Sequence, residues 1–214
     1  MPREYKLLGI ILVLAIGLGW LLFHFGGTNA PQTVPLQDRA DAYSKGSATA
    51  RITLTEFADF QCPACRAARS VIDQVMADHP QDIKLVFRHF PLTTIHPLAL
   101  LAAEASEAAG HQGKFWEMHD LLYARQEEWG SLAKSSSSQE ALALFNRYAT
   151  ELSLDLPKFS KDIQTNAYNS IIDGDMSTAA ASGVSATPQF FVNGKKVSEP
   201  SHAALKAAVD AALK

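Results

Sequence analysis

The only two cysteines of the chain, Cys62 and Cys65, stand three residues apart in the stretch FQCPAC, residues 60–65. Pro63 is preorganised for the first turn of a helix, where its missing N–H costs nothing. Cys62 would then lie at the helix N-terminus, where the helix dipole and unpaired N–H groups stabilise a thiolate. Cys65 would follow on the same helix face, within disulfide reach. The spacing therefore predicts a redox-active pair, with Cys62 as the exposed attacking thiol and Cys65 as the more buried resolving thiol.

Other uses of a cysteine pair fit the sequence less well. A structural bridge would close a loop too short to remove much unfolded-state entropy. Two cysteines can neither build a disulfide scaffold nor complete a four-cysteine zinc site. His89 and His96 show no paired metal-ligand spacing with the cysteines, and Arg66 stands where covalent haem attachment would need histidine. We therefore expect neither a metal nor another cofactor.

Glu56 precedes Cys62 by six residues, in a segment whose β-branched alternation predicts a strand. Its side chain falls on the same strand face as Ile52, Leu54 and Ala58. A carboxyl group buried on that face would have a raised pKa and could exchange a proton with the resolving thiol. The alternative is a partly exposed carboxylate at the rim of the sheet.

The elements that must position these residues follow from hydrophobic periodicity and turn signals. In chain order the expected elements are a strand (51–59), a helix (63–78), a strand (83–90), several helices (97–181), two short strands (188–192 and 196–197) and a helix (201–213). This order predicts one α/β domain with a helical insertion. The expected divisions are an N-terminal membrane anchor or signal peptide (1–27), a linker and domain entry (28–50), and the domain itself (51–214) with its helical insertion at about 96–181.

The N-terminal segment has the length and composition of a membrane span. Residues 7–23 carry no charge, and the apolar stretch extends to about 20 residues, enough to cross a hydrocarbon core of ~30 Å. Arg3 and Lys6 precede it, which predicts a cytoplasmic N-terminus and an exported C-terminal part. A cleaved signal peptide is the alternative. The expected location is a bacterial inner (cytoplasmic) membrane, crossed once, with the catalytic domain facing the periplasm or the cell exterior.

Composition excludes other classes of protein. The chain has 214 residues, a formal net charge of −3 and 19% charged residues of mixed sign, so it is neither disordered nor a polyelectrolyte. No cluster of lysine and arginine stands out, and this argues against nucleic acid as a partner.

Four segments together resemble the DsbA-like thioredoxin-fold thiol:disulfide oxidoreductases: EFADFQCPAC, VFRHFPL, HPLALLAAEASEAAGHQGKFWEMHDLLY and GVSATPQFFVNGK. The resemblance covers about residues 38–213. It implies a thioredoxin fold interrupted by a helical insertion, with Cys62 as the nucleophile and Cys65 as its partner. It also places Glu56 where the family often has a buried acid.

The resemblance changes the expectation for Pro188, which directly precedes an apolar strand segment. An X–Pro bond is cis in only ~5–6% of cases, so the residues alone favour a trans Thr187–Pro188 bond. The resemblance instead implies that Pro188 is cis and packs against the cysteine pair. It also implies that Thr187 offers backbone hydrogen bonds to an extended substrate.

One position departs from the best-known oxidising members, because Ala64 stands where they have a histidine before the second cysteine. Losing a thiolate-stabilising histidine would change the thiol pKa by about one unit, or ~1.4 kcal/mol. For a two-electron couple this corresponds to ~30 mV, against the ~60 mV that separates strong oxidants from isomerase-like proteins. Pro63 and Ala64 are thus expected to tune the pair without settling the direction of catalysis.

The expected function is an exported oxidoreductase that introduces disulfides into cysteine-containing exported proteins through Cys62 and Cys65. A membrane partner, linked to quinone, would reoxidise the pair, and the protein itself is expected to be a monomer. Two alternatives stay open. One is a disulfide reductase or isomerase kept reduced by a different membrane partner. The other is a non-catalytic thioredoxin-like binding or chaperone module with a passive bridge.

Overall fold

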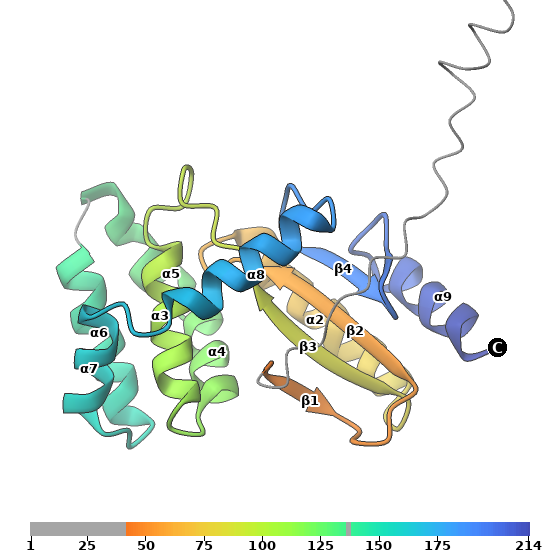
Figure 1. The fold of residues 1–214 in the computed structure, drawn as a ribbon, viewed down its shortest axis with the longest axis horizontal. Helices are drawn as coiled ribbons and strands as arrows, with labels where there is room; N and C mark the ends of the chain where they lie inside the picture. The colour runs from red at the N-terminus through yellow and green to blue at the C-terminus, as the bar shows by residue number, and fades with distance from the viewer. Residues whose placement is uncertain (1–41, 136–137) are drawn as a thin grey trace, which may run out of the picture. The chain divides into compact units, whose positions relative to one another are not determined.

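A computed structural model of the protein describes residues 42–135 and 138–214. Its sheet has the strand order β1-β3-β2-β4-β5. The strands are β1 (Ser44–Gly46), β2 (Ile52–Ala58), β3 (Ile83–His89), β4 (Gln189–Val192) and β5 (Lys195–Lys196). β2 and β3 pair in parallel at the centre, and every other pairing is antiparallel. The parallel pair brings the C-terminal ends of β2 and β3 to the same edge of the sheet (Figure 1).

One face of the sheet is covered by α2 (Pro63–Asp78) and α9 (His202–Leu213), both of which lie behind the strands in Figure 1. The alternation of β2 directs Ile52 and Leu54 to this face, where both side chains are fully buried. α2 contributes Ile72 and Val75 to the same cluster, and α9 contributes Leu205 and Val209. The apolar faces of the two helices therefore hold α2, with its cysteines, firmly against the sheet.

The opposite face of the sheet is covered by α8 (Asn169–Ala181). Phe57 of β2 packs edge-on against Phe191 of β4, with 5.8 Å between ring centroids. Arg88 of β3 forms an ion pair with Asp175 of α8, with 2.6 Å between Nε and Oδ1, and both side chains are buried. This contact joins α8 to the central strand.

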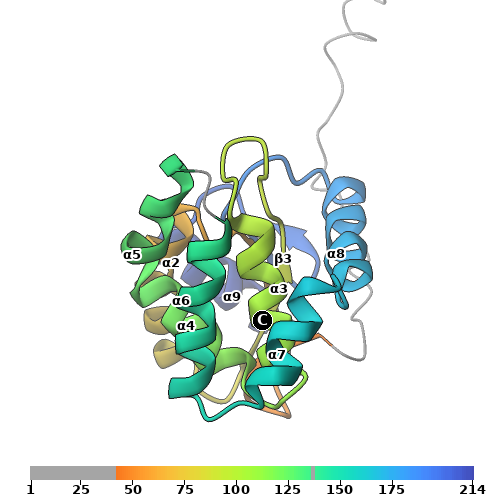
Figure 2. The same cartoon turned by 90° about the vertical axis from the view of Figure 1, so that its left-hand side faces the viewer.

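The helical insertion lies between β3 and β4. Its elements before α8 are α3 (Ala99–Gly110), α4 (Phe115–Ala124), α5 (Gln126–Gly130), the 3-10 helix η1 (Ser131–Ser135), α6 (Ser138–Glu151) and α7 (Leu156–Gln164). In Figure 2 the α helices of this set face the viewer, with α8 to one side. They share a hydrophobic core that continues to Phe60, Cys65 and Phe87. The core of the insertion thus ends at the cysteine pair.

The predicted order of elements agrees with the structure, apart from three local differences. β1 was not predicted, since residues 44–46 lack apolar alternation and become a strand only by pairing with the edge of β3. Residues 157–181 form two helices, because Asn166 adopts a left-handed φ of 52° between α7 and α8. α3 begins at Ala99, later than the expected start at His96–Pro97.

The predicted N-terminal anchor (1–27) and most of the predicted linker (28–50) lie outside the described residues. Within the described residues, no helix has both the length and the apolar character needed to cross a membrane.

Candidate active site

The two cysteines lie where β2 passes into α2. Cys62 is the residue that caps the N-terminus of α2, and Pro63 occupies the first helical turn, as predicted. The Cys62 N–H donates to the carbonyl of Asp59, with 3.1 Å between the atoms. Both cysteines are free thiols in this structure. The side chain of Cys65 is fully buried.

Cys62 is less exposed than its predicted role as the exposed thiol implies, because only 7% of the residue is accessible. The loop that precedes β4 lies against Cys62. The Cys62 thiol donates a hydrogen bond to the carbonyl of Thr187 in this loop, with 3.6 Å between Sγ and O. The order of exposure, with Cys62 above the fully buried Cys65, still agrees with the prediction.

The environment separates the pKa values of the two thiols. A hydrogen bond from the Cys65 side chain is the largest influence that lowers the pKa of Cys62, to about 5. The nearby Thr187 side chain and the backbone of Cys65 and Ala64 act in the same direction, while burial opposes them. Burial, followed by the hydrogen bond to Cys62, raises the pKa of Cys65 far above its ordinary value. At neutral pH the reduced pair is therefore a Cys62 thiolate beside a Cys65 thiol.

The Thr187–Pro188 peptide bond is cis, as the family resemblance implied and as the residues alone did not predict. Pro188 is half-buried and directly precedes β4. The antiparallel pairing of β4 with β2 carries Thr187 to Cys62 across 125 residues of sequence. The structure therefore brings Thr187 to the reactive sulfur.

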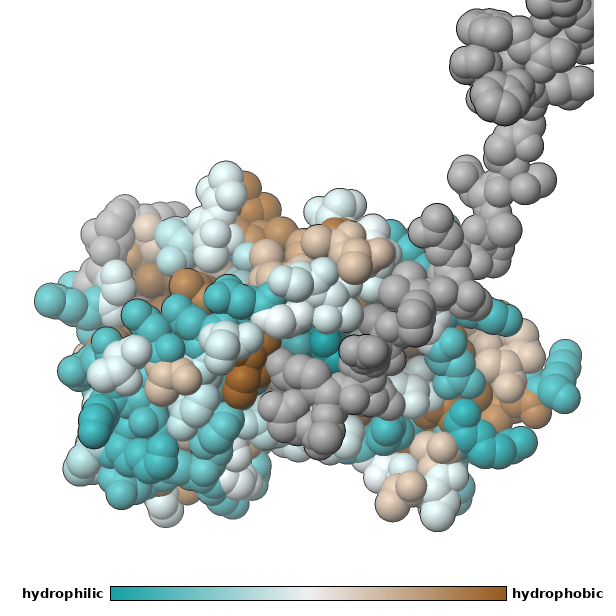
Figure 3. Space-filling view, in the orientation of Figure 1, coloured by the Kyte–Doolittle hydropathy of each residue, from teal (hydrophilic) through white to brown (hydrophobic). Residues whose placement is uncertain are grey.

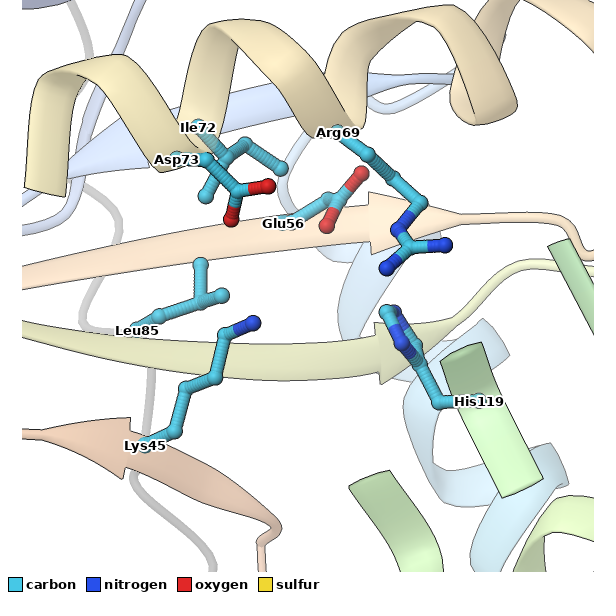
Figure 4. Close-up of a pocket in the computed structure, with 7 residues that line it drawn as sticks. All are labelled: Lys45, Glu56, Arg69, Ile72, Asp73, Leu85 and His119. Carbon is cyan, nitrogen blue, oxygen red and sulfur yellow. The ribbon is translucent and has the colours of Figure 1, made fainter. Parts of the chain in front are cut away.

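Glu56 is buried in β2, with 2% of the residue accessible, and the alternative of a carboxylate at the sheet rim is wrong. Burial raises its pKa to about 8, against the opposing influence of Lys45 and Arg69. Its Oε1 has no hydrogen-bond partner among the described residues. Figure 4 shows its carboxyl group between α2 and the strands, facing a cavity of about 10 Å³, which is close to the room needed for one water molecule.

This cavity is also lined by a residue that the sequence did not single out, His119 of α4. Burial lowers the pKa of His119 to about 4, so the ring is neutral. Its Nδ1 lies 2.9 Å from Oδ1 of Asp120. Nothing in the local sequence signals that α4 would reach Glu56.

Asp59 is a second functional residue that the sequence did not single out. Its carboxylate accepts hydrogen bonds from the backbone N–H groups of Gln61 at 2.7 Å and Leu92 at 2.9 Å. The same group lies 2.7 Å from Nδ1 of His96. Its own N–H donates to the sulfur of Cys65 at 3.5 Å. An aspartate that bonds the N–H two residues later is a local turn signal, and this signal could have found it.

Gln126 of α5 is a third such residue, and no local signal points to it. Its Nε2 donates to the carbonyl of Phe60 at 2.8 Å and to that of Cys62 at 2.9 Å. The residue is 5% exposed. The helical insertion is thereby fastened to the loop that carries the nucleophile.

No group of three or more His, Cys, Asp or Glu side chains in the described parts of the chain is arranged to hold a metal ion. A low-pKa thiolate next to a protonated thiol can exchange disulfides.

Comparisons with known proteins agree with this fold. The family profile described as Thioredoxin matches residues 40–211. A thioredoxin-like oxidoreductase from Silicibacter pomeroyi is 26% identical, with a TM-score of 0.66, and the match covers 82% of this chain and 94% of that one. DsbA2 of Pseudomonas aeruginosa is 25% identical, with a TM-score of 0.58, covering 78% of this chain and 91% of that one.

The curated relatives carry a different name. A protein of Salinispora tropica named Na(+)/H(+) antiporter NhaA 3 is 37% identical over 223 residues, which is 95% of this chain and 32% of that protein. The chain thus spans about a third of the length of the curated relatives that it matches. The profile match, the cysteine pair and the solved relatives together identify the chain as a member of the thioredoxin family and, within it, as a DsbA-like thiol:disulfide oxidoreductase.

Proposed function

We propose that the protein is an exported, membrane-anchored oxidase that introduces disulfides into cysteine-containing extracytoplasmic proteins. The observation that carries this direction is the position of the Cys62 sulfur at the N-terminus of α2 and beside the Cys65 side chain, which lowers its pKa to about 5. At pH 7 an ordinary thiol is protonated, whereas Cys62 is ionised. The free energy by which this ionisation stabilises the reduced pair is set by the difference between pH 7 and the Cys62 pKa of about 5. That is about 3 kcal/mol, or about 60 mV for a two-electron couple.

A stabilised reduced form makes the disulfide form a stronger oxidant. The expected loss from having Ala64 in place of a histidine was ~30 mV. The pKa of about 5 already reflects Ala64 at that position, so the Cys62 thiolate is stabilised without that histidine. The oxidase direction is therefore favoured over the reductase or isomerase alternative.

The reaction proceeds by two thiol–disulfide exchanges. A substrate thiolate attacks Sγ of Cys62 in the oxidised pair, the Cys62–Cys65 bond breaks, and a mixed disulfide forms. Cys65 leaves with the electron pair and takes a proton from Glu56, which is protonated at neutral pH because its pKa is about 8. A second substrate thiolate then attacks the substrate sulfur and releases the Cys62 thiolate. Two electrons pass from the substrate dithiol to the pair.

Reoxidation transfers these two electrons to a second protein with an oxidised disulfide, for which a quinone-linked membrane protein is the proposed class. The chain has no third cysteine for an internal relay. Anchoring would keep the domain close to such a partner.

The direction of electron flow is tested by the redox state of Cys62 and Cys65 in living cells. Cells are quenched with acid, free thiols are alkylated, and the mass shift is read on an immunoblot. A pair that is mostly disulfide supports the oxidase. A pair that is mostly dithiol overturns it in favour of the reductase or isomerase.

A substitution at the resolving cysteine tests whether the pair is catalytic at all. In Cys65→Ala the mixed disulfide on Cys62 cannot be resolved by the partner thiol, so substrates should accumulate as reducible cross-linked species. Absence of these species, with an unchanged phenotype for Cys62→Ser, would point to the non-catalytic binding module instead.

The names of the curated relatives favour a second, narrower role. In those proteins a region similar to this chain makes up about a third of a sequence named as a Na(+)/H(+) antiporter. The second candidate is a redox module whose client is an integral membrane ion transporter. Mass spectrometry of the species trapped by Cys65→Ala tests it, because a transporter should then be among the cross-linked proteins.

A further inference from the structure

Glu56 needs a path by which its proton exchanges with solvent, because its carboxyl group is buried. In the proposed reaction Glu56 gives a proton to Cys65 and must then regain one. When the pair is reoxidised, Cys65 returns its proton, and Glu56 must first have lost its own. Glu56 is 2% exposed, and its Oε1 has no hydrogen-bond partner among the described residues. The path for protons therefore runs through the protein.

The face of the sheet that carries α8 offers no such path. Side chains alternate along β2, so Glu56 points to the opposite side of the sheet from Phe57. Phe57 packs against Phe191 in an apolar cluster that also contains Ala179 and Val184. Figure 3, which views the molecule from the side of α8, shows hydrophobic residues along the upper edge, over α8 and the loop that joins β3 to α3. The path must lie on the side of α2.

On the side of α2, the carboxyl group of Glu56 faces the cavity of about 10 Å³, which is close to the room needed for one water molecule (Figure 4). Four other ionisable side chains line this cavity: Lys45 of β1, Arg69 and Asp73 of α2, and His119 of α4. The ammonium group of Lys45 and the guanidinium group of Arg69 have no lone pair that could accept a proton. Asp73 and His119 are the lining groups that can take a proton from Glu56 through a water molecule.

The contacts of His119 favour it as the acceptor. Figure 4 shows its ring extending from α4 toward Arg69 and Glu56. Burial raises the pKa of Asp120, but the hydrogen bond with His119 and the charge of Arg69 outweigh burial, so the pKa is lowered and the carboxylate is ionised. An ionised carboxylate cannot donate, so the proton of the bond between Nδ1 and Asp120 belongs to Nδ1. Because the ring is neutral, its Nε2 has a lone pair that can accept a proton.

Asp120 connects this ring to solvent. The side chain of Asp120 is 51% exposed, whereas that of His119 is 4% exposed. A guanidinium nitrogen of Arg69 lies 2.7 Å from the same Oδ1 of Asp120 and holds the carboxylate in place. The rings of Trp116 and Tyr123 pack edge-on against the imidazole, each with 5.0 Å between ring centroids. The imidazole is thus held between the buried cavity and a carboxylate at the surface.

We propose that His119 and Asp120 form a proton relay between Glu56 and solvent, through one water molecule in the cavity. A proton that arrives at Nε2 releases the proton of Nδ1 to Asp120, from which it passes to solvent. The reverse passage returns a proton to Glu56. Since one proton leaves and one enters in each cycle, the ring ends in the tautomer in which it began, and no electrons move. The inference rests on the proposed function, in which Glu56 exchanges a proton with Cys65.

The low basicity of His119 leaves this relay faster than catalysis. Burial lowers the pKa of His119 to about 4 and raises that of Glu56 to about 8, so about one attempt in 10⁴ places the proton on the ring. With about 6 × 10¹² attempts per second, protons cross more than about 10⁸ times per second, while a typical kcat is about 1–10³ s⁻¹. A ring of low pKa also does not retain the proton, and so it leaves Glu56 protonated at neutral pH.

The relay is tested by the rate at which the Glu56 carboxyl group exchanges its proton. The sample is the reduced full-length protein with ¹³C-labelled glutamate carboxyl groups, and the signal missing from Glu56→Gln identifies Glu56. Near pH 8, where Glu56 is half ionised, fast proton exchange gives one NMR resonance at the average position of the two forms. Slow exchange gives two separate resonances. Wild type should give one.

Two substitutions interrupt the relay, and a third is the control. Asp120→Asn removes the group that takes up the proton but retains the Oδ1 atom that His119 and Arg69 contact. It should slow the exchange by about a hundredfold, as should His119→Phe, which retains an aromatic ring. Asp82→Asn also removes a carboxylate that is paired with an arginine, Arg51 at 3.0 Å, but Asp82 does not line the cavity. It should exchange as fast as wild type.

A single averaged resonance in Asp120→Asn would overturn the relay, and this variant decides alone if His119→Phe does not fold. Asp73 is the exposed acid of the same cavity, so Asp73→Asn is compared as well. Slow exchange in Asp73→Asn with fast exchange in Asp120→Asn would assign the path to Asp73 and reject the proposal. Equal slowing in Asp82→Asn and Asp120→Asn would reject it too, as general loosening.

Failure of the proposed function has a different signature. A Glu56 resonance in wild type that does not titrate near pH 8 would contradict the proton step of the exchange reaction itself, and the relay with it. The direction of electron flow is read separately, from the redox state of the cysteine pair in cells.

Discussion

At the scale of single residues, the chemistry depends on one side chain whose pKa is lowered and two whose pKa values are raised. The Cys62 thiol ionises readily, while Cys65 and Glu56 hold their protons. The three side chains belong to one short stretch of sequence. Their different behaviour arises from what surrounds each one, and each difference can be measured.

The low pKa of Cys62 has a consequence for the stability of the reduced protein. A depressed folded-state pKa contributes stability that is fully present above the unfolded-state value of about 8.5 and is lost as pH falls through about 5. The quantity to compare is the free energy of unfolding of reduced wild type minus that of Cys62→Ser. This difference should be larger at pH 7 than at pH 4 by about 2–3 kcal/mol. Urea denaturation of both proteins at the two pH values measures this. A difference that does not change with pH would contradict it.

Glu56 shifts stability in the opposite sense. Its folded-state pKa of about 8 lies above the ordinary value, so ionisation favours the unfolded chain increasingly between pH 4.5 and 8. Glu56→Gln should raise the free energy of unfolding of the reduced protein by about 3 kcal/mol at pH 7 and change it little at pH 4.5. Denaturant titrations at the two pH values test this, and an equal gain at both would be inconsistent with a buried, protonated carboxyl group.

The same substitution tests the proton transfer. The wild-type exchange rate, corrected for ionisation of the substrate thiol, should fall as pH rises through about 8, when Glu56 loses its proton. Glu56→Gln should be slower by at least about tenfold at pH 7 and should lack this fall. A pH profile of Glu56→Gln that is superimposable on that of wild type would rule out the relay.

At the scale of elements, the site is assembled from four contributions. β2 supplies Glu56, the start of α2 supplies both cysteines, the loop before β4 supplies Thr187, and α5 supplies Gln126. The first two follow one another in sequence. The others arrive only through strand pairing and helix packing.

Gln126 offers a test of how far the helical insertion tunes the cysteines. Gln126→Ala removes the side-chain donor from the carbonyl groups of Phe60 and Cys62, of which the Cys62 carbonyl still accepts from the N–H of Arg66, and should cost about 1–2 kcal/mol of folding free energy. It should also raise the pKa of Cys62, since the loop before α2 is no longer fastened. Thiolate absorbance followed against pH reports that pKa.

Gln112 is the control for this substitution, because it also bonds the backbone at two points, the N–H and carbonyl of Asp155, away from the cysteines. Gln112→Ala should leave the pKa of Cys62 unchanged. If both variants shifted the pKa alike, the effect would be general loosening and Gln126 would have no specific role.

At the scale of the whole molecule, the proposed function depends on where the domain is held. The uncharged segment at residues 7–23 has the length of a membrane span. The full-length protein should therefore remain with the membrane fraction after a carbonate wash, and protease added outside the cytoplasmic membrane should degrade the domain. An immunoblot of fractionated cells measures both, and a soluble mature form beginning near residue 31 would identify a cleaved signal peptide instead.

The sequence by itself determined the chemistry and much of the architecture. Three of its patterns are local: a cysteine pair with proline at a helix start, strand alternation and helical periodicity. They can be recognised in the sequence because they depend on backbone conformation and the helix dipole, which involve only neighbouring residues. The alternation of residues 52–58 even assigned Glu56 to the face that packs on α2.

Only the tertiary structure decided what surrounds the pair. The cis Thr187–Pro188 bond was implied by family resemblance but not by the residues, since isolated X–Pro bonds favour trans. The burial of Glu56, the bonds from Gln126 and the contact of Thr187 with Cys62 join segments as much as 125 residues apart. Such contacts depend on packing between distant elements, and it is this packing that turns two cysteines into a thiolate and a protonated partner.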